Sequence, residues 1–590
     1  MRYDRLNAMR IPLVMHGPLV VLALWAGVAA ASSPGPVELP FKGRLGFTSR
    51  LADGRLFAVY LESRPALEWK DVSIPQHVVG RFSSDEGAGW SDPQVLFSPA
   101  GPGILHAAYP LGTRDGNLHI FYLQKLDWDR PVDWSKTSAL LMHTVSRDGG
   151  RSWQEPRSID YGAQYTGALN SVVQLASGRL LVPLSYLVVP HRESGAFAST
   201  VVYSDDAGKT WKRSPSAVTV DSGGKIVESG AIEPVVAELP DGRVWMVMRT
   251  QAGYMFESFS SDGGATWSPA RKSVFRATNS PGAVLRLRNG STVIAWNNEF
   301  DYNLFHGVSY CRQVMAMAID DGAGWRGYRQ VSPPIQASED IRSSVGYPFL
   351  LEAKDGGILL GYNERRVVGG RAGVRLFRVR PEWLRETASA EDFSAGVAGL
   401  YTVGTKGLEV THGPEDRPAV RIQRTRAFEI GEPLPPSGMT WNFPFGRRGS
   451  VNMKVRLDPG FGGADFTLSE YSIRPYHREG GVFRWSLGSD LRWRVQYANN
   501  GPYLPANPPV INLLLSEPAS RAETGRTLDL TVKWDAEQNV AWLYQDGRFV
   551  AFLLGLEAFR GISYLRLTSA AADTDPAGFL LLGLCSRGEP

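Results

Sequence analysis

The chain has 590 residues, which is longer than one ordinary domain and long enough for two or three. Hydrophobic residues make up 43% of it, and its 63 Gly and 39 Pro favour a turn-rich, all-β protein. The formal net charge is only +4 and there is no long basic run, so nucleic acid is not expected as a partner.

The segment 1–31 predicts a signal peptide. Three arginines precede an apolar stretch from Ile11 to Ala30, and small residues follow around Ala31. Cleavage there would export the mature chain to a secreted or periplasmic location. The alternative is an uncleaved membrane anchor, because the apolar stretch approaches spanning length. A His-Gly-Pro sequence at residues 16–18 interrupts the stretch, so cleavage is favoured and stable membrane insertion is not expected.

One short motif recurs five times in the first two-thirds of the chain, as in Ser204-Asp-Asp-Ala-Gly-Lys-Thr-Trp211. Its Asp can accept backbone N–H bonds in a tight turn, its Gly permits a left-handed backbone, and its Trp packs on the neighbouring strands. The five aspartates are 63, 58, 56 and 58 residues apart: Asp85, Asp148, Asp206, Asp262 and Asp320. A period of this length without a helical pattern inside it is typical of one blade of a β-propeller.

A second series of turns runs out of phase with the first. Each is a dipeptide of the Asp-Gly type between apolar strand patterns, which is a hairpin signal. The six dipeptides begin at Asp53, Asp115, Ser177, Asp241, Asn289 and Asp355. The alternation predicts a six-bladed propeller over residues 36–384, whose last blade lacks the Asp motif. An N-terminal strand would complete that blade and close the ring.

A different pattern begins after residues 385–395, which we interpret as a linker. Apolar and polar residues alternate from Leu528 to Trp534, and a hairpin turn follows at Asp546-Gly547. We therefore expect a β-sandwich or jelly roll over residues 396–590. It weakly resembles concanavalin-like domains, which leaves both a sugar-binding and a structural role open.

Strand polarity predicts where functional side chains gather. If the Asp-Gly turns join first to second strands and the Asp motifs join third to fourth strands, both kinds of turn lie on one rim of the ring. Residues about one strand length away then lie on the opposite rim. The candidates at an offset of 8 or 9 residues are Arg44, Glu233, Arg249, Arg312 and Tyr347. The aspartates of the repeated motif lie on the other rim, where we expect a structural role.

The repeated motif resembles the Asp-box, or BNR repeat, of the sialidase superfamily. The segment from Gly230 to Arg249 is similar to the family segment that carries a paired glutamate and the second arginine, and Gly346-Tyr347-Pro348 is similar to the segment with the tyrosine nucleophile. Arg312 takes the place of the third arginine. Arg44-Leu-Gly falls where the family usually has Arg-Ile-Pro.

The resemblance implies a role for each of these residues. Three arginines, Arg44, Arg249 and Arg312, would hold the substrate carboxylate. Tyr347 would be the nucleophile, since a neutral group avoids repulsion by that carboxylate and sialidases use Tyr in this role. Glu233 would act as its base.

A separate acid must protonate the leaving oxygen. The family has an Asp in the loop after the second strand of the first blade, where this chain offers Glu62, Glu68 and Asp71. Asp71 is the candidate chosen on position.

The sequence thus predicts an exported, retaining exo-sialidase-like glycoside hydrolase acting on a sialoglycan or another acidic glycan. One alternative is a hydrolase or lyase of the same fold acting on another acidic sugar, and a second is a non-catalytic glycan-binding propeller. No cofactor is expected, because the nine His residues and the two cysteines, Cys311 and Cys585, lack metal-site spacing. A disulfide between these cysteines is not expected either.

Overall fold

The computed structural model describes most of the chain after residue 33. The described residues are 34–68, 70–127, 133–190, 195–221, 229–299, 312–334, 343–365, 372–402, 407–425, 438–473, 480–498, 510–514, 522–571 and 573–589. The predicted signal peptide and Cys311 lie outside them. The described elements are almost all strands, with one short α-helix, α2 (Pro381–Arg385), and two 3₁₀ turns, η2 (Ala66–Glu68) and η4 (Pro414–Asp416). The all-β class is therefore confirmed.

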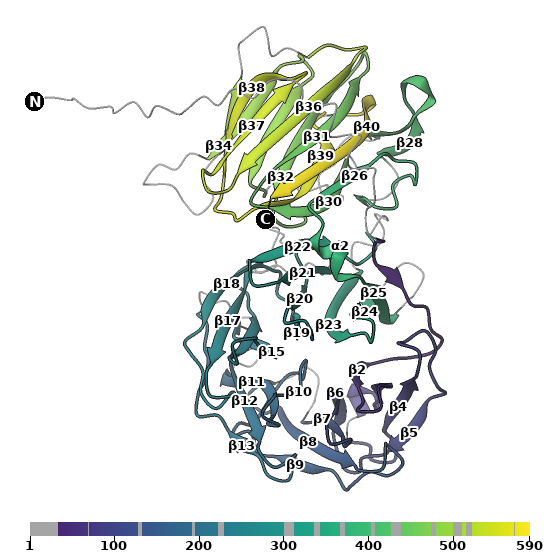
Figure 1. Ribbon diagram of the computed structural model, residues 1–590, viewed down its shortest axis with the longest axis vertical. Helices are drawn as coiled ribbons and strands as arrows, with labels where there is room; N and C mark the ends of the chain where they lie inside the picture. Colours follow the sequence, from purple (N-terminus) through teal and green to yellow (C-terminus); the bar gives the residue numbers. More distant parts are fainter. Residues whose placement is uncertain are drawn as a thin grey trace, which may run out of the picture.

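Six small sheets follow one another along the chain and are arranged in a ring in Figure 1. The first three contain β2 (Phe47–Arg50), β3 (Leu56–Glu62), β4 (His77–Ser83) and β5 (Gln94–Phe97); β6 (Ile104–Gly112), β7 (Leu118–Leu126), β8 (Ser138–Ser146) and β9 (Arg157–Ile159); and β10 (Val173–Gln174), β11 (Leu180–Pro190), β12 (Gly195–Ser204), β13 (Lys212–Arg213) and β14 (Ser229–Gly230). The next three contain β15 (Ile232–Glu238), β16 (Val244–Arg249), β17 (Tyr254–Ser260) and β18 (Arg271–Arg276); β19 (Ala283–Arg286), β20 (Thr292–Trp296), β21 (Ala316–Asp320) and β22 (Trp325–Gln330); and β23 (Ser344–Glu352), β24 (Ile358–Arg365), β25 (Ala372–Val379) and β1 (Val37–Glu38).

The two series of turns occupy the places that polarity predicted. Every Asp-Gly-type dipeptide joins the first strand of a sheet to the second, and every Asp-box joins the third to the fourth. The first strands face the centre of the ring (Figure 1). The predicted N-terminal strand is also confirmed, because β1 pairs with β25 in the register Val37↔Arg378. The start of each first strand and the end of each second strand therefore lie together on the rim opposite the turns.

The Asp-box at Asp206 shows how these turns are held. The Asp206 carboxylate accepts hydrogen bonds from the Thr210 amide at 2.9 Å and from the Ser204 hydroxyl at 2.8 Å. The same Ser204 hydroxyl accepts one from the Gly208 amide at 2.9 Å. Hydrogen bonds from the Thr210 hydroxyl and amide lower the pKa of Asp206 to about 2. The motif is thus a self-contained turn whose contacts span only a few residues.

We predict that Asp206→Ala lowers the free energy of unfolding by about 1 kcal/mol, because the Thr210 amide loses its acceptor near the surface. The folded pKa is depressed, so this contribution is present above the unfolded value near 3.8 and is lost as the pH falls through about 2. Urea unfolding measures the change. Asp205→Ala is the control, since Asp205 forms exposed ion pairs with Arg179 and Lys212. Turnover per folded molecule should persist in both variants; its loss in Asp206→Ala would show that the box takes part in chemistry.

Two larger sheets form the C-terminal part of the molecule. The first contains β28 (Leu408–His412), β29 (Pro418–Arg424), β40 (Asp575–Glu589), β31 (Arg448–Leu457), β36 (Thr527–Asp535), β37 (Val540–Gln545), β38 (Arg548–Leu554) and β26 (Ala388–Glu391). The second contains β27 (Tyr401–Thr402), β30 (Gly438–Gly446), β39 (Ile562–Ser569), β32 (Gly463–Ser469), β33 (Phe483–Gly488), β34 (Trp493–Ala498) and β35 (Val510–Leu514). One buried cluster joins the two sheets, with Trp485, Trp493 and Trp534 among its side chains.

The predicted linker over residues 385–395 is wrong in its centre. β26 pairs with β40, in the register Ala388↔Arg587, and so belongs to the larger C-terminal sheet. The sequence of this segment predicts a linker because nothing near it in the sequence indicates a pairing strand. Its actual partner, β40, is the last strand in the described chain. The C-terminal module therefore begins several residues earlier than residue 396.

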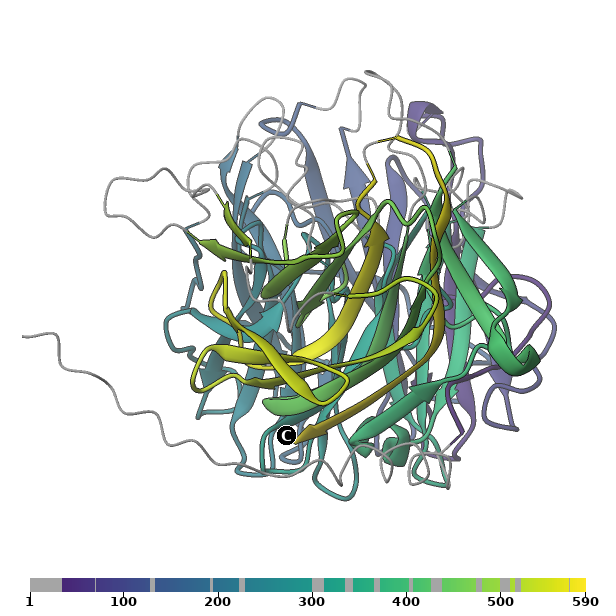
Figure 2. The same cartoon turned by 90° about the horizontal axis from the view of Figure 1, so that it is seen from above.

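The ring and the C-terminal module pack directly against each other (Figures 1 and 2). The Arg276 guanidinium of β18 bonds to the carboxylates of Glu470 at 3.2 Å and Glu557 at 2.9 Å. Its carbon Cζ lies 4.8 Å from the ring centroids of Tyr254 and Tyr471, one from each module. This buried cation is a structural anchor between the two parts of the chain.

Two further observations concern membrane-spanning helices and the Cys585 thiol. No helix within the described ranges is long and apolar enough to cross a bilayer. Cys585 is buried as a free thiol in β40, and burial raises its pKa.

Candidate active site

Two strained bulges present the central pair of side chains. The register of β15 against β16 shifts between Ile232 and Val235, and that of β23 against β24 shifts between Gly346 and Phe349. Inside these bulges Glu233 has a φ of 50° and Tyr347 a φ of 54°. Left-handed backbone at a non-glycine residue is uncommon and costs about 1 kcal/mol or more, and bulges next to active sites re-aim side chains.

The bulges bring Tyr347 and Glu233 together from different sheets. The Tyr347 hydroxyl donates to Glu233 Oε1 at 3.1 Å. The other carboxylate oxygen, Oε2, accepts a bond from Arg249 Nη1 at 2.8 Å, and the side chains of Glu233 and Arg249 are only 7% and 3% exposed. A phenol in contact with a buried carboxylate is the arrangement that a base-activated tyrosine nucleophile needs.

The second cation of this cluster, Arg312, lies beside the same pair. Its guanidinium carbon is 5.7 Å from the Tyr347 ring centroid. Burial and the charge of Arg249 lower the pKa of Arg312, against the opposing influence of Tyr347 and Glu233. Two guanidiniums that repel each other in a buried place are stabilised by an anion between them.

Asn279 holds both arginines. Its side-chain Oδ1 accepts a hydrogen bond from Arg249 Nε at 2.5 Å. Its backbone oxygen accepts two from Arg312, at 3.2 Å from Nε and 2.6 Å from Nη2. The spacing of the two guanidiniums is therefore set by one residue that was not among the candidates from the sequence.

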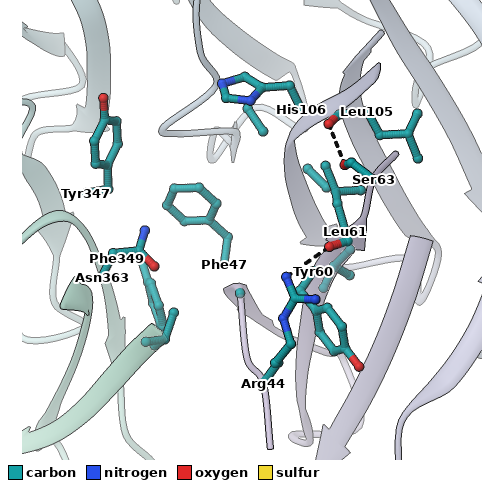
Figure 3. Close-up of a pocket in the computed structure, with 15 residues that line it drawn as sticks. Arg44, Phe47, Tyr60, Leu61, Ser63, Leu105, His106, Tyr347, Phe349 and Asn363 are labelled. Carbon is teal, nitrogen blue, oxygen red and sulfur yellow. Dashed lines mark hydrogen bonds between the residues drawn. The ribbon is translucent and has the colours of Figure 1, made fainter. Parts of the chain in front are cut away.

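A pocket of ≈ 260 Å³ adjoins Tyr347 (Figure 3). It is lined by residues from the first, second and sixth sheets: Arg44, Gly46, Phe47, Val59, Tyr60, Leu61, Ser63, Leu105, His106, Ala107, Ala108, Tyr347, Phe349, Asn363 and Val374. Its volume is below the roughly 300–1,000 Å³ of pockets for drug-sized ligands, which suits a single sugar unit.

Arg44 lines this pocket, whereas Arg249 and Arg312 are not among its lining residues. Its Nη2 donates to the Leu61 carbonyl at 3.1 Å, and its Cζ is 5.0 Å from the Tyr60 ring centroid. Figure 3 shows it across the pocket from Tyr347. The structure thus gathers Glu233, Arg249, Arg312 and Tyr347 closely and places Arg44 on the facing wall, exposed to an incoming ligand.

Asp71 is not brought to the pocket. It is exposed, and its Oδ1 accepts hydrogen bonds from the Ser73 amide at 3.0 Å and the Ser73 hydroxyl at 2.6 Å. These bonds lower the pKa of Asp71, whereas a general acid at neutral pH needs a raised one. The sequence placed Asp71 by position within a loop, and a loop position does not determine where a side chain points.

His106 is a pocket residue that the sequence candidates missed. It is exposed to the pocket, yet burial within the surrounding protein and the charge of Lys125 lower its pKa to about 3, against a backbone hydrogen bond with Gly167. The imidazole is therefore neutral at pH 7. His106 lies 9 residues before Asp115, the same offset that selects Arg44 before Asp53, so the rim rule could have found it.

This chain resembles a known protein family and several known proteins. The family model for the BNR repeat-like domain matches residues 54–360. The chain belongs to the BNR repeat-like family. A sialidase of Micromonospora viridifaciens is 25% identical over 494 residues, covering 77% of this chain and 68% of that protein. An anhydrosialidase of Macrobdella decora is 27% identical over 192 residues, covering 30% of this chain and 22% of that protein. The resemblance to the sialidase superfamily inferred from the Asp-boxes is confirmed.

Solved structures that resemble this chain include Trypanosoma rangeli sialidase, at 15% identity and a TM-score of 0.43, covering 95% of this chain and 97% of that chain. A Dyadobacter fermentans protein of unknown function has 17% identity and a TM-score of 0.44, covering 59% of this chain and 98% of that chain.

We predict that Arg249→Lys in this BNR repeat-like protein raises KM for a carboxylate-bearing substrate by about tenfold or more. A lysine can keep the charge but cannot bond Glu233, Asn279 and a substrate carboxylate at once, because it lacks the planar fork. Steady-state kinetics measures the change. Arg243→Lys is the control, because Arg243 forms an exposed pair with Asp241 on the turn rim. Equal KM values in both variants would show that Arg249 does not bind the substrate carboxylate.

Proposed function

We propose that this protein is an exported glycoside hydrolase that removes terminal sialic acid from glycans with retention of configuration. Its catalytic part would be a six-bladed propeller, and its C-terminal part a β-sandwich domain. The observation that carries the proposal is the hydrogen bond between Tyr347 and Glu233 at 3.1 Å, beside the buried Arg249 and the half-buried Arg312. The relationship to characterised sialidases supports the glycosidase class. Export rests on the sequence of the segment 1–31.

In the first step the Tyr347 oxygen attacks the anomeric carbon while Glu233 accepts the phenolic proton. The bond from that carbon to the leaving oxygen breaks, and the leaving oxygen takes a proton from an acid. Water then attacks the same carbon from the vacated side and gives one proton to the conjugate base of that acid. The bond to Tyr347 breaks, and Glu233 returns the proton to the phenolate. Two inversions give net retention.

The substrate carboxylate would lie between Arg249 and Arg312, with Arg44 reaching it from the facing wall of the pocket. The buried cluster of Arg249, Arg312 and Glu233 has one cation in excess when no ligand is bound, so an anion restores neutrality. Asp71 fits the role of acid only if the loop after β3 turns its carboxylate from Ser73 into the pocket.

Elimination from another acidic sugar is a second candidate, and the neutral His106 in the pocket favours it. An unprotonated imidazole could take the proton on the carbon next to the carboxylate. The carbon–oxygen bond on the adjacent carbon would then break to leave a double bond, and Tyr347 would give its proton to the departing oxygen. Hydrolysis is preferred because Glu233 already occupies the place of the base for Tyr347.

Hydrolysis of a fluorogenic sialoside, measured against a panel of other glycosides, tests the proposal. Release from the sialoside alone is the expected result. Polyuronates are included, and the ultraviolet absorbance of an unsaturated product identifies elimination. Cleavage of uronates with no action on sialosides would replace the first candidate by the second, and turnover of neither class would leave a binding protein.

A further inference from the structure

A third bulge matches the two that present Tyr347 and Glu233. In the second sheet, the register of β6 against β7 shifts between His106 and Tyr109, and Ala107 has a φ of 51°. The residue before each bulge pairs with the residue that lies 8 positions after the start of the turn dipeptide: His106↔Leu123, Ile232↔Arg249 and Gly346↔Asn363. Ala107 is therefore the counterpart of Glu233 and Tyr347.

This third bulge presents no catalytic side chain of its own, although it has the same strained backbone. Left-handed conformations at non-glycine residues persist where the surrounding structure requires them, and they cluster at functional sites. What the bulge at Ala107 does present is its neighbour His106, whose ring enters the pocket opposite Tyr347 (Figure 3).

The second strands supply another, independent comparison. In three sheets, the position equivalent to Arg249, counted from the turn dipeptide, carries a polar side chain that is hydrogen-bonded within the fold. The Ser185 hydroxyl accepts a hydrogen bond from the Glu233 backbone amide at 3.1 Å. Arg249 bonds to Asn279. The Asn297 amide donates to the Val314 and Val345 carbonyls, each at 3.0 Å.

Asn363 occupies the same position in the sixth sheet but is used differently. Its side chain is exposed and lines the pocket on the wall that also carries Tyr347. Across the described part of the chain, no residue shares a hydrogen bond with its side-chain amide. The equivalent side chains hydrogen-bond within the fold in three other sheets, whereas the side chain of Asn363 faces a cavity.

We propose that His106 and Asn363 form a neutral recognition pair for the uncharged, hydroxyl- or amide-bearing part of the acidic sugar whose carboxylate the arginines hold. The inference rests on the proposed function. Both side chains can donate and accept hydrogen bonds without a charge, which matches hydroxyl and amide groups. A site built to hydrogen-bond such substituents discriminates strongly against analogues that lack them. The pair therefore selects among acidic sugars, while the arginines select for acidity.

The test compares His106→Ala and Asn363→Ala with the unmodified protein on fluorogenic acidic glycosides that differ only in one uncharged substituent, either acetamido, glycolylamido or hydroxyl. Each variant is expected to raise KM for the preferred substrate about tenfold, the loss of roughly one good hydrogen bond. We expect kcat to change less than about twofold, and the ratio of kcat/KM between substrates to fall towards one.

Asn297→Ala is the matched control, because it removes the same amide at the equivalent position of the fifth sheet. It should lower Tm and leave the preference among substrates unchanged. Unaltered KM and unaltered preference in both pocket variants would overturn the inference. So would a loss of kcat at constant KM in His106→Ala, since that pattern indicates proton transfer rather than recognition.

Thermal shifts with N-acetylneuraminate and galacturonate separate this inference from the proposed function. Binding by the unmodified protein that weakens in both pocket variants supports the recognition pair even if no sialoside is cleaved. Cleavage of sialosides with full preference in both variants overturns the pair and leaves the proposed function standing. Absence of both binding and cleavage in the unmodified protein overturns both.

Discussion

Tyr347→Phe is expected to lower kcat on a sialoside by about 10³-fold or more, because removal of a covalent nucleophile leaves only binding and electrostatic contributions. The phenyl ring should keep its place under Arg312, since the ring and not the hydroxyl forms the contact at 5.7 Å. KM should therefore change little. The loss would then belong to the chemical step.

A fluorinated sialoside that traps the glycosyl-enzyme should label Tyr347 in the unmodified protein, as peptide mapping would show. Tyr161→Phe is the control for removal of a buried tyrosine hydroxyl elsewhere, because Tyr161 donates to the Ala139 carbonyl at 2.6 Å in the second sheet. That variant should lose stability and keep its turnover. Full activity of Tyr347→Phe, or a label on another residue, would contradict the proposed mechanism.

Arg276→Ala should lower the free energy of unfolding by about 3–5 kcal/mol, as expected when one partner of a buried ionic cluster is removed. Glu470 would remain buried without its cation, at the contact between the ring and the C-terminal module. Differential scanning calorimetry should show either a lower Tm or the separation of one transition into two. Arg271→Ala is the control, because the exposed Arg271 pairs with the partly buried Glu257 in a contact worth about 1 kcal/mol or less.

The deficit of Arg276→Ala should depend on pH in a defined direction. Burial raises the pKa of Glu470 above 4.5, and the Arg276 charge opposes that rise. Without Arg276 the folded variant binds a proton more tightly than the unfolded chain does. Its stability is then retained at low pH and falls as the pH rises through the folded pKa of Glu470. A deficit independent of pH, or one as small as that of Arg271→Ala, would contradict the role of Arg276 as an anchor.

Local patterns in the sequence were sufficient to predict the repeat and the rim of the ring on which the candidate site residues lie. An Asp-box is closed by bonds between residues four apart or fewer, such as Thr210 to Asp206, so its residues specify the turn by themselves. The Asp-Gly-type dipeptides likewise carry their own backbone conformation. Because turns alternate regularly with strands of similar length, Glu233, Arg249 and Tyr347 could be placed on one rim before any contact was known.

Contacts between distant residues decided the rest. Glu233 and Tyr347 are 114 positions apart, and they meet only because two bulges turn their side chains toward each other. Register shifts depend on how paired strands match, which one strand's sequence does not contain. The role of Asn279 could not be predicted from the sequence either. It sets the spacing of two arginines through its backbone oxygen as well as its side chain.

The side-chain directions of two sequence candidates, Asp71 and Arg44, also depend on contacts that their positions in the sequence do not determine. Asp71 was chosen by its place in a loop, and its carboxylate bonds to Ser73 rather than entering the pocket. Arg44 follows the rim rule, but its guanidinium is held on the facing wall by the Leu61 carbonyl. Periodicity in the sequence determines the height of a residue in the ring, because each strand advances a fixed distance per residue. The direction of a side chain across the ring is set by neighbours from other sheets, and only the tertiary structure brings those together.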